Sequence, residues 1–184
     1  MRKILLLILL TGFISEKLLA QCTPVITGNP GATSDYINNF TFGAISNLNS
    51  GDNPADYALY PQTGNYTQSL SYPFTIQTGS PTWGQGLGMW IDFNGNNSFL
   101  DLGEFVWSSP TAANTSANIL SGNITIPVAA VPGVRRMRIA CKFNNLVVAA
   151  DECGFNGFGE YEDYNITIVA NVACSGTPVG GTAS

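Results

Sequence analysis

The stretch WIDFNGNNSFLDLGE, residues 90–104, changes from a strand-like apolar run into a turn rich in oxygen-bearing side chains. Oxygen donors at alternate positions of a turn are the ligands that a hard cation such as calcium requires. The sequence therefore predicts a calcium loop at a strand end, with five candidate ligands: Asp92, Asn94, Asn96, Asp101 and Glu104. The alternative is a polar hairpin turn, because Asn94 followed by Gly95 is itself a strong turn signal.

On both sides of this loop, apolar and polar residues alternate with the period of a β-strand. Runs rich in Ile, Val, Thr, Tyr and Phe, separated by Gly, Asn, Pro and Ser, predict strands at 36–45, 66–76, 86–93, 104–107, 118–126, 134–143 and 161–170. This pattern predicts an all-β fold, an antiparallel β-sandwich of jelly-roll or immunoglobulin-like type with about 7 to 9 strands.

The chain begins with a signal peptide pattern. Arg2 and Lys3 precede an apolar run, and Ala20 ends a plausible cleavage site, so residues 1–20 are expected to be removed on export. Residues 21–170 are then the β-sandwich domain. Residues 171–184 are small and rich in Gly, which predicts a linker or the start of a following module. We therefore expect a secreted or cell-surface protein, with no membrane insertion after cleavage and with other domains of a longer chain as partners.

The charge of the exported part disfavours whole classes of partner. Of the 7 basic and 12 acidic residues, the leader takes Arg2, Lys3, Lys17 and Glu16, which leaves 4 basic and 11 acidic residues. A net charge of −7 argues against nucleic acid and anionic membranes, because both require a basic surface.

The chain contains no histidine, which excludes Ser-His-Asp and Cys-His catalysis and every histidine-based zinc site. The four cysteines are more simply explained by disulfides in an exported protein. Cys141 and Cys153 are predicted to pair, because Cys141 ends a strand and the loop between them is short. The partners of Cys22 and Cys174 stay open, since four cysteines allow three connectivities.

A second acidic segment, DECGFNGFGEYEDY, spans residues 151–164 and leads into a buried strand. Counting by two along that strand places Glu160 and Glu162 on the inner face, with Asp163 pointing the opposite way. Carboxylates at a core edge need a partner. Arg135 is predicted to serve the two glutamates, and Arg136 or Arg138 to serve Asp163. The alternative is a cation shared with the 92–104 loop.

Three segments together resemble the GEVED domain of secreted proteins of Bacteroidetes-type bacteria: MWIDFNGNNSFLDLGE (89–104), GVRRMRIACKF (133–143) and GEYED (159–163). The likeness extends over roughly residues 22–170, and Tyr161 stands where the family motif has valine. The resemblance implies a β-rich extracellular module of undetermined function, found beside proteases, adhesion-type domains and secretion-sorting domains.

These observations favour a non-catalytic module. Carboxylate pairs such as Glu160 with Glu162 could suggest a glycosidase, but residues two apart on any strand lie about 6–7 Å from each other, so the spacing is not diagnostic. We expect a calcium-stabilised spacer or interaction domain. The alternatives are a module that binds polysaccharide or a cell surface through Trp83, in the glycine-rich stretch SPTWGQG (80–86), and an accessory domain of a secreted protease.

Overall fold

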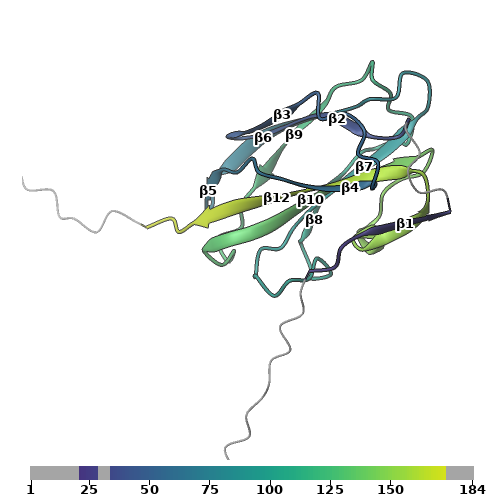
Figure 1. Cartoon of the computed structure of the whole chain (residues 1–184). Coiled ribbons are helices and arrows are strands. Elements are labelled where there is room, and N and C mark those ends of the chain that lie inside the picture. Colours follow the sequence, from purple (N-terminus) through teal and green to yellow (C-terminus); the bar gives the residue numbers. More distant parts are fainter. Residues whose placement is uncertain (1–20, 29–33, 173–184) are drawn as a thin grey trace, which may run out of the picture.

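The computed structural model describes residues 21–28 and 34–172 of the chain (Figure 1). The predicted signal peptide, most of the predicted linker and Cys174 lie outside these residues. Among the residues described, no helix is long and apolar enough to cross a membrane.

The fold is all-β, as predicted, with two main sheets packed face to face (Figure 1). The larger sheet has the order β4 (Tyr57–Tyr60), β12 (Gly159–Val169), β10 (Gly133–Phe143), β7 (Gln85–Ile91) and β8 (Phe105–Ser108), with β5 (Asn65–Thr67) also paired to β12. The smaller sheet has the order β3 (Ile45–Leu48), β2 (Ile37–Phe42), β6 (Ser71–Thr78) and β9 (Leu120–Thr125).

A third, two-stranded sheet pairs β1 (Val25–Gly28) in parallel with β11 (Gly154–Gly157), and a short 3-10 turn covers Ala149–Asp151. Residues 21–28 and 34–172 thus form 12 strands, more than the sequence predicted. The predicted 36–45 strand is a hairpin, because the chain turns at Gly43 with a φ of 51° before β3 begins. The sheets are also not wholly antiparallel, since β4 and β5 both pair with β12 in parallel.

The core between the two main sheets is formed by side chains that alternate along each strand. Along β10, Met137, Ile139 and Cys141 face this core, while Arg138 and Ala140 point to the other face of the larger sheet. Removal of large apolar side chains from water contributes roughly 1.5–3 kcal/mol for each one.

The outer face of the larger sheet is covered as well. A second apolar cluster lies there, built from Ile26, Trp90, Phe99, Ala140, Val147, Phe155 and Tyr161. It places β1, the loop that follows β7 and the segment before β12 over the sheet. Strand β7 is therefore buried along its whole length, and charged residues on β10 and β12 that would otherwise face water are enclosed.

Candidate functional site

The acidic loop (residues 92–104) is held by hydrogen bonds from its own backbone. The Asp92 carboxylate accepts the N–H groups of Gly95 at 2.6 Å and Asn97 at 3.0 Å. Gly95 and Asn97 both have positive φ, 76° and 64°, which turns these N–H groups toward one carboxylate. Glu104 Oε1 accepts the N–H of Phe93 at 2.9 Å. The two ends of the loop are therefore tied by carboxylates that are themselves almost fully buried.

At the tip of the loop, Asp101 Oδ2 accepts hydrogen bonds from Asn94 Nδ2 at 3.0 Å and Asn96 Nδ2 at 2.7 Å. These bonds lower the pKa of the exposed Asp101 carboxyl. The side-chain oxygens of Asn94 and Asn96 accept the N–H groups of Asn96 and Ser98, each at 2.9 Å. All five predicted calcium ligands thus lie in one loop. The hydrogen bonds given above join their side chains to other groups of the same loop.

Glu104 has a buried side-chain oxygen that the loop does not satisfy. It is 2% exposed, and its Oε2 atom has no hydrogen-bond partner. Burial and, to a smaller extent, the charges of Asp92 and Asp101 raise the pKa of this carboxyl to about 7, against the opposing effect of the N–H groups of Asn94 and Phe93. Across residues 21–28 and 34–172, however, no three Asp, Glu or Cys side chains are gathered closely enough to hold a metal ion. A cation here would need the asparagine and backbone oxygens too.

The second acidic segment contains a buried ion pair between strands. Asp163 on β12 lies opposite Arg138 on β10, and the two side chains form a two-pronged contact, Nε to Oδ1 at 2.7 Å and Nη2 to Oδ2 at 2.8 Å. Arg136 Nη1 reaches Asp163 Oδ2 at 3.2 Å, and the Tyr57 hydroxyl donates to the same oxygen at 3.1 Å. Arg138 is 1% exposed, so this pair is fully desolvated.

Arg138 also binds the N-terminal segment. Its Nη2 donates to the backbone oxygen of Cys22 at 2.8 Å, and its Nη1 donates to that of Glu152. The guanidinium carbon lies 5.2 Å from the ring centroid of Phe99 in the acidic loop. One side chain thus joins β10, β12, the N-terminal segment and the acidic loop. Sequence reasoning assigned Arg138 only to Asp163. One pattern in the sequence could have pointed to these further partners. Strand alternation places Trp90, Ala140 and Tyr161 on the same outer face as Arg138.

The expected pairing of Arg135 with the two glutamates is wrong. Arg135 lies opposite Ile166, whereas Glu162 and Glu160 lie opposite Ile139 and Cys141, about 13 Å or more along the strand. The Arg135 guanidinium instead donates to the backbone oxygens of Val131, Pro132 and Val134.

Glu160 and Glu162 face the interior, and neither forms an ion pair with an Arg or Lys of the described residues. Glu160 accepts the N–H groups of Ile37 at 2.9 Å and Asn53 at 3.1 Å, which fixes the start of β2 and the loop before β4. Glu162 Oε2 accepts the hydroxyl of Tyr164 at 2.6 Å, while its Oε1 has no hydrogen bond of normal geometry. Burial raises the pKa of Glu160 to about 9 and that of Glu162 to about 7.

These shifts predict a fold that is more stable in mild acid. Each of these three carboxyls has a pKa in the folded state above its ordinary 4.5. Its contribution to the stability of the fold is therefore complete below pH 4.5 and is lost as pH rises through 7 to 9. We expect the free energy of unfolding to fall by a few kcal/mol between pH 5 and pH 8. Urea denaturation at both pH values measures it. The Glu104→Gln, Glu162→Gln double variant should show a flatter profile, and an unchanged slope in that variant would contradict the assignment.

The cysteine pairing differs from the prediction. Cys153 bonds to Cys22, and Cys141 is a free, buried thiol. The reason is strand alternation: Cys141 faces the core between the sheets, where its Sγ contacts the Asp35 backbone oxygen at 3.1 Å. Cys153 lies over the outer face beside Arg138, so the larger sheet separates the two. Burial raises the pKa of the Cys141 thiol well above its ordinary value.

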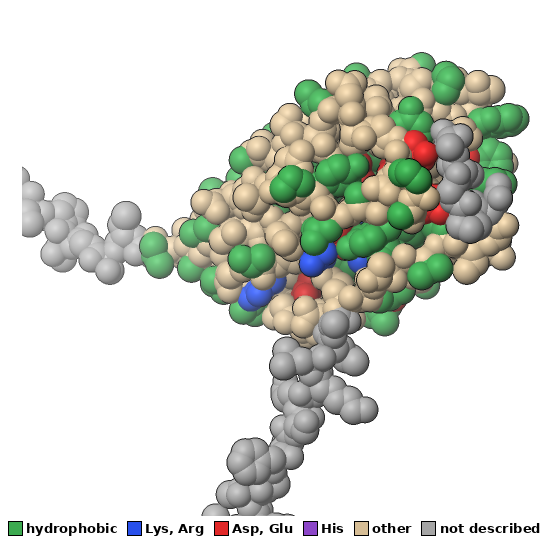
Figure 2. Space-filling view, viewed as in Figure 1, with side chains coloured by type: hydrophobic (Ala, Val, Ile, Leu, Met, Phe, Trp, Pro, Cys, Tyr) green, Lys and Arg blue, Asp and Glu red, His purple; other side chains and the backbone are tan. Residues whose placement is uncertain are grey.

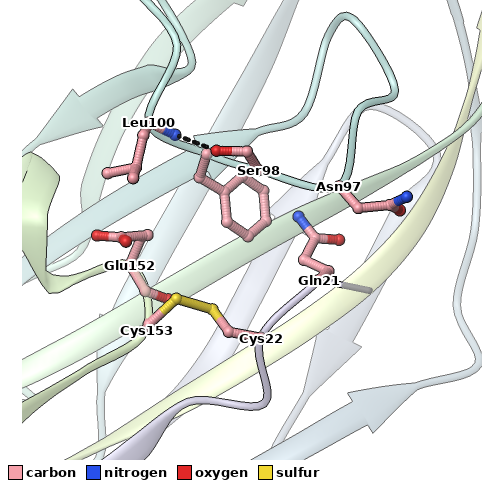
Figure 3. Close-up of a pocket in the computed structure, with 8 residues that line it drawn as sticks. Gln21, Cys22, Asn97, Ser98, Leu100, Glu152 and Cys153 are labelled. Carbon is pink, nitrogen blue, oxygen red and sulfur yellow. Dashed lines mark hydrogen bonds between the residues drawn. A yellow bond between two sulfur atoms is a disulfide. The ribbon is translucent and has the colours of Figure 1, made fainter. Parts of the chain in front are cut away.

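Beside the disulfide lies a shallow cavity of about 180 Å³ (Figure 3). It is lined by Gln21, Cys22, Asn97, Ser98, Phe99, Leu100, Glu152 and Cys153. Two of its polar atoms, Gln21 Nε2 and Glu152 Oε2, are buried without a hydrogen-bond partner. Neither residue was singled out from the sequence, because their proximity depends on a contact between the two ends of the domain.

Trp83 is 53% exposed, on the loop between β6 and β7. Its ring meets Phe143 edge to face, with centroids 5.8 Å apart, and Phe143 meets Phe158 in the same way at 5.6 Å. By contrast, Trp90 is fully buried and Trp107 packs against the core. On the face shown in Figure 2, charged side chains form only small patches among uncharged ones.

Solved structures resemble the chain only distantly. The PKD domain of a peptidase from a Thermoplasmatales archaeon has 13% identity and a TM-score of 0.35, over 72% of this chain and 93% of that one. A CARDB domain from Pyrococcus furiosus has 9% identity and a TM-score of 0.36, over 76% and 100%. An entomopoxvirus fusolin has 11% identity and a TM-score of 0.41, over 71% and 47%. At these values the likeness concerns the all-β fold alone.

Among curated proteins the chain has no match. A family profile does match part of it. The matched segment contains β7 except its first residue, the acidic loop, the three arginines of β10 and the GEYED segment, which are the features that build the two acidic sites described above. Residues 86–167 match the family described as the GEVED domain.

Proposed function

We propose that the described residues form one non-catalytic GEVED-type module of a larger secreted bacterial protein, in which it serves as a spacer or interaction domain. One observation carries this proposal. The charged groups of the GEYED segment are used inside the fold: Asp163 binds Arg136 and Arg138, and Glu160 binds the backbone of Ile37 and Asn53. Side chains engaged in this way hold strands together and are not displayed to a substrate.

The disulfide supports the extracellular part of the proposal. Disulfides persist in oxidising compartments and are rare in the cytosol. The Cys22–Cys153 bond fixes the chain two residues after the predicted cleavage point, and the described chain leaves the domain after β12 at a different place (Figure 1). A module with separate entry and exit points can be joined in series with other domains.

Calcium stabilisation of the acidic loop is part of the proposal. It is supported by the buried, unpartnered Oε2 of Glu104 and by the oxygen-rich side chains around it. A bound cation would neutralise a carboxylate that burial otherwise penalises. The ligands would be drawn from Asp92, Asn94, Asn96, Asp101 and Glu104, together with backbone oxygens.

Thermal unfolding tests calcium binding. At pH 8, where Glu104 is more ionised, millimolar calcium should raise the melting temperature by several degrees over a chelator, since extracellular modules bind at roughly 10⁻⁴ to 10⁻³ M. At pH 5.5 the shift should be smaller, because protons compete for the carboxylates. Asp101→Asn, at the exposed tip of the loop, should reduce the shift. Equal melting temperatures with calcium and chelator at pH 8 would remove calcium from the proposal.

A second candidate function is binding of polysaccharide. It is favoured by the exposure of Trp83 and its support by Phe143 and Phe158, because a held aromatic ring can stack on a sugar. A glycan array separates the two functions. A spacer should be retained on no glycan. A binding module should be retained by at least one, and Trp83→Ala should weaken that retention at least tenfold while the melting temperature stays unchanged.

A further inference from the structure

We propose that Gln21 is the first residue of the exported chain and is converted there to pyroglutamate, the cyclic lactam of glutamine. This inference rests on the secreted location proposed above and adds a modification site to it. The predicted cleavage after Ala20 would give Gln21 a free α-amine, which is the one group the ring closure requires.

The reaction is internal to one residue. The α-amine nitrogen attacks the side-chain Cδ, a new C–N bond closes a five-membered ring, and the Cδ–Nε2 bond breaks. The amide nitrogen leaves as ammonia and carries away a proton from the amine. No oxidant, metal or second substrate is consumed, and the intramolecular geometry gives the amine a high effective concentration at Cδ.

The structure shows where the reacting side chain lies. The Gln21 side chain lies at the cavity beside the disulfide, near Asn97 of the acidic loop (Figure 3). Its Nε2 atom is buried and donates no hydrogen bond. A buried donor without an acceptor costs free energy. The atom lost as ammonia is this same nitrogen, so cyclisation removes a donor that has no hydrogen-bond partner among the described residues.

The next residue explains why loss of charge matters at this place. Cys22 is held by the disulfide to Cys153, and its backbone oxygen accepts from Arg138 Nη2 at 2.8 Å. Arg138 Nη1 lies 3.4 Å from Cys22 Sγ. A protonated α-amine one residue away would add a second positive charge beside this guanidinium. The lactam nitrogen is neutral, so cyclisation removes that repulsion.

The position also gives the modification a consequence. In the predicted exported chain, Gln21 is the one residue that precedes Cys22. An aminopeptidase that removed two residues would cut Cys22 from the chain, and with it the bond that holds β1 against β11. A lactam has no free amine for such an enzyme to recognise. Pyroglutamate would therefore protect the disulfide from loss by trimming.

Peptide mass spectrometry of the full protein, purified from the medium or periplasm of its own host, tests this proposal. The N-terminal peptide should begin at residue 21, be lighter than the unmodified peptide by one ammonia, and fail to react with an amine label. A peptide that begins at residue 21 with a reactive amine would overturn the proposal and leave secretion intact. A protein that keeps residues 1–20 would overturn both.

An enzymatic challenge adds an independent readout. A general aminopeptidase should leave the N-terminal peptide of the wild-type protein intact, and pyroglutamyl aminopeptidase should shorten it by one residue. Gln21→Ala cannot cyclise and should be trimmed at residue 21 by the general enzyme. Non-reducing peptide mapping checks that both proteins still contain the Cys22–Cys153 bond. Equal trimming of the two proteins by the general enzyme would contradict the proposal.

Discussion

Arg138→Met is expected to lower the free energy of unfolding by about 3 to 5 kcal/mol, the usual cost of removing one partner from a buried ion pair. Arg138 is 1% exposed, and its guanidinium satisfies both oxygens of Asp163. Methionine fills a similar volume but leaves Asp163 with only Arg136 and the Tyr57 hydroxyl. The backbone oxygens of Cys22 and Glu152 would lose a donor as well.

Urea denaturation of the purified domain at constant pH measures this effect. Arg135→Met is the matched control, since it lies on the same strand and loses the same charge. Its guanidinium donates to backbone oxygens at a half-buried position and forms no ion pair among the described residues, so its cost should stay below about 1 kcal/mol. Similar losses for the two variants would mean that net charge, and not the buried pair, determines the effect.

A double variant separates the ion pair from the packing around it. Asp163→Leu removes the buried carboxylate that Arg138→Met deprives of its two-pronged partner, so the two changes together should cost much less than the sum of the single changes. Arg136 would then lack a carboxylate, but its side chain is 25% exposed and can be solvated. Strict additivity of the two losses would show that Arg138 acts through its packing alone.

The period-two pattern in the sequence was sufficient for the fold class and for the direction of most side chains. It placed Glu160 and Glu162 on the inner face of their strand and Asp163 on the outer face, which is how the structure has them. Such predictions hold because side-chain direction along a strand depends on local geometry alone.

Register was not predictable in the same way. Which residue of β10 lies opposite Glu160 depends on how two distant strands align, and no local signal specifies it. Arg135 was therefore assigned to the glutamates although it lies opposite Ile166. Strands β4 and β5 are short, 4 and 3 residues, and they join β12 by parallel pairing, which the sequence pattern did not indicate.

The covered outer face of the larger sheet was the main feature missed. The sequence pattern predicts a β-sandwich and does not indicate a further layer over the residues of β10 that point away from the core. In the structure the N-terminal segment, the acidic loop and residues 144–157 cover that face. Arg138 consequently has interior partners, and Cys153 forms its disulfide with Cys22 and not with the predicted partner Cys141. The contacts of Cys22 with Arg138 and Cys153 join residues 116 and 131 positions apart, so these pairings could be identified only in the folded structure.

Removal of the disulfide is the second change with a large expected effect. The bond joins residues separated by 131 positions, and closing a loop of that length stabilises the folded state by about 5 kcal/mol in the chain-entropy model. The Cys22→Ser, Cys153→Ser double variant should lose stability of this order, because its unfolded chain is free of the restraint. It also frees β1, whose described ladder partner is β11.

The control is Cys141→Ala, which removes the cysteine that the sequence had paired with Cys153. Because Cys141 is a free thiol in the core, this variant should keep the Cys22–Cys153 bond and lose only about 1 kcal/mol from reduced packing. Urea denaturation gives the two losses, and non-reducing peptide mapping identifies the bonded cysteines. A linked peptide that contained Cys141, or a larger loss for Cys141→Ala than for the double variant, would show that the bond crosses the sheet. The outer layer would then be held to the sandwich by Arg138 and apolar contacts alone.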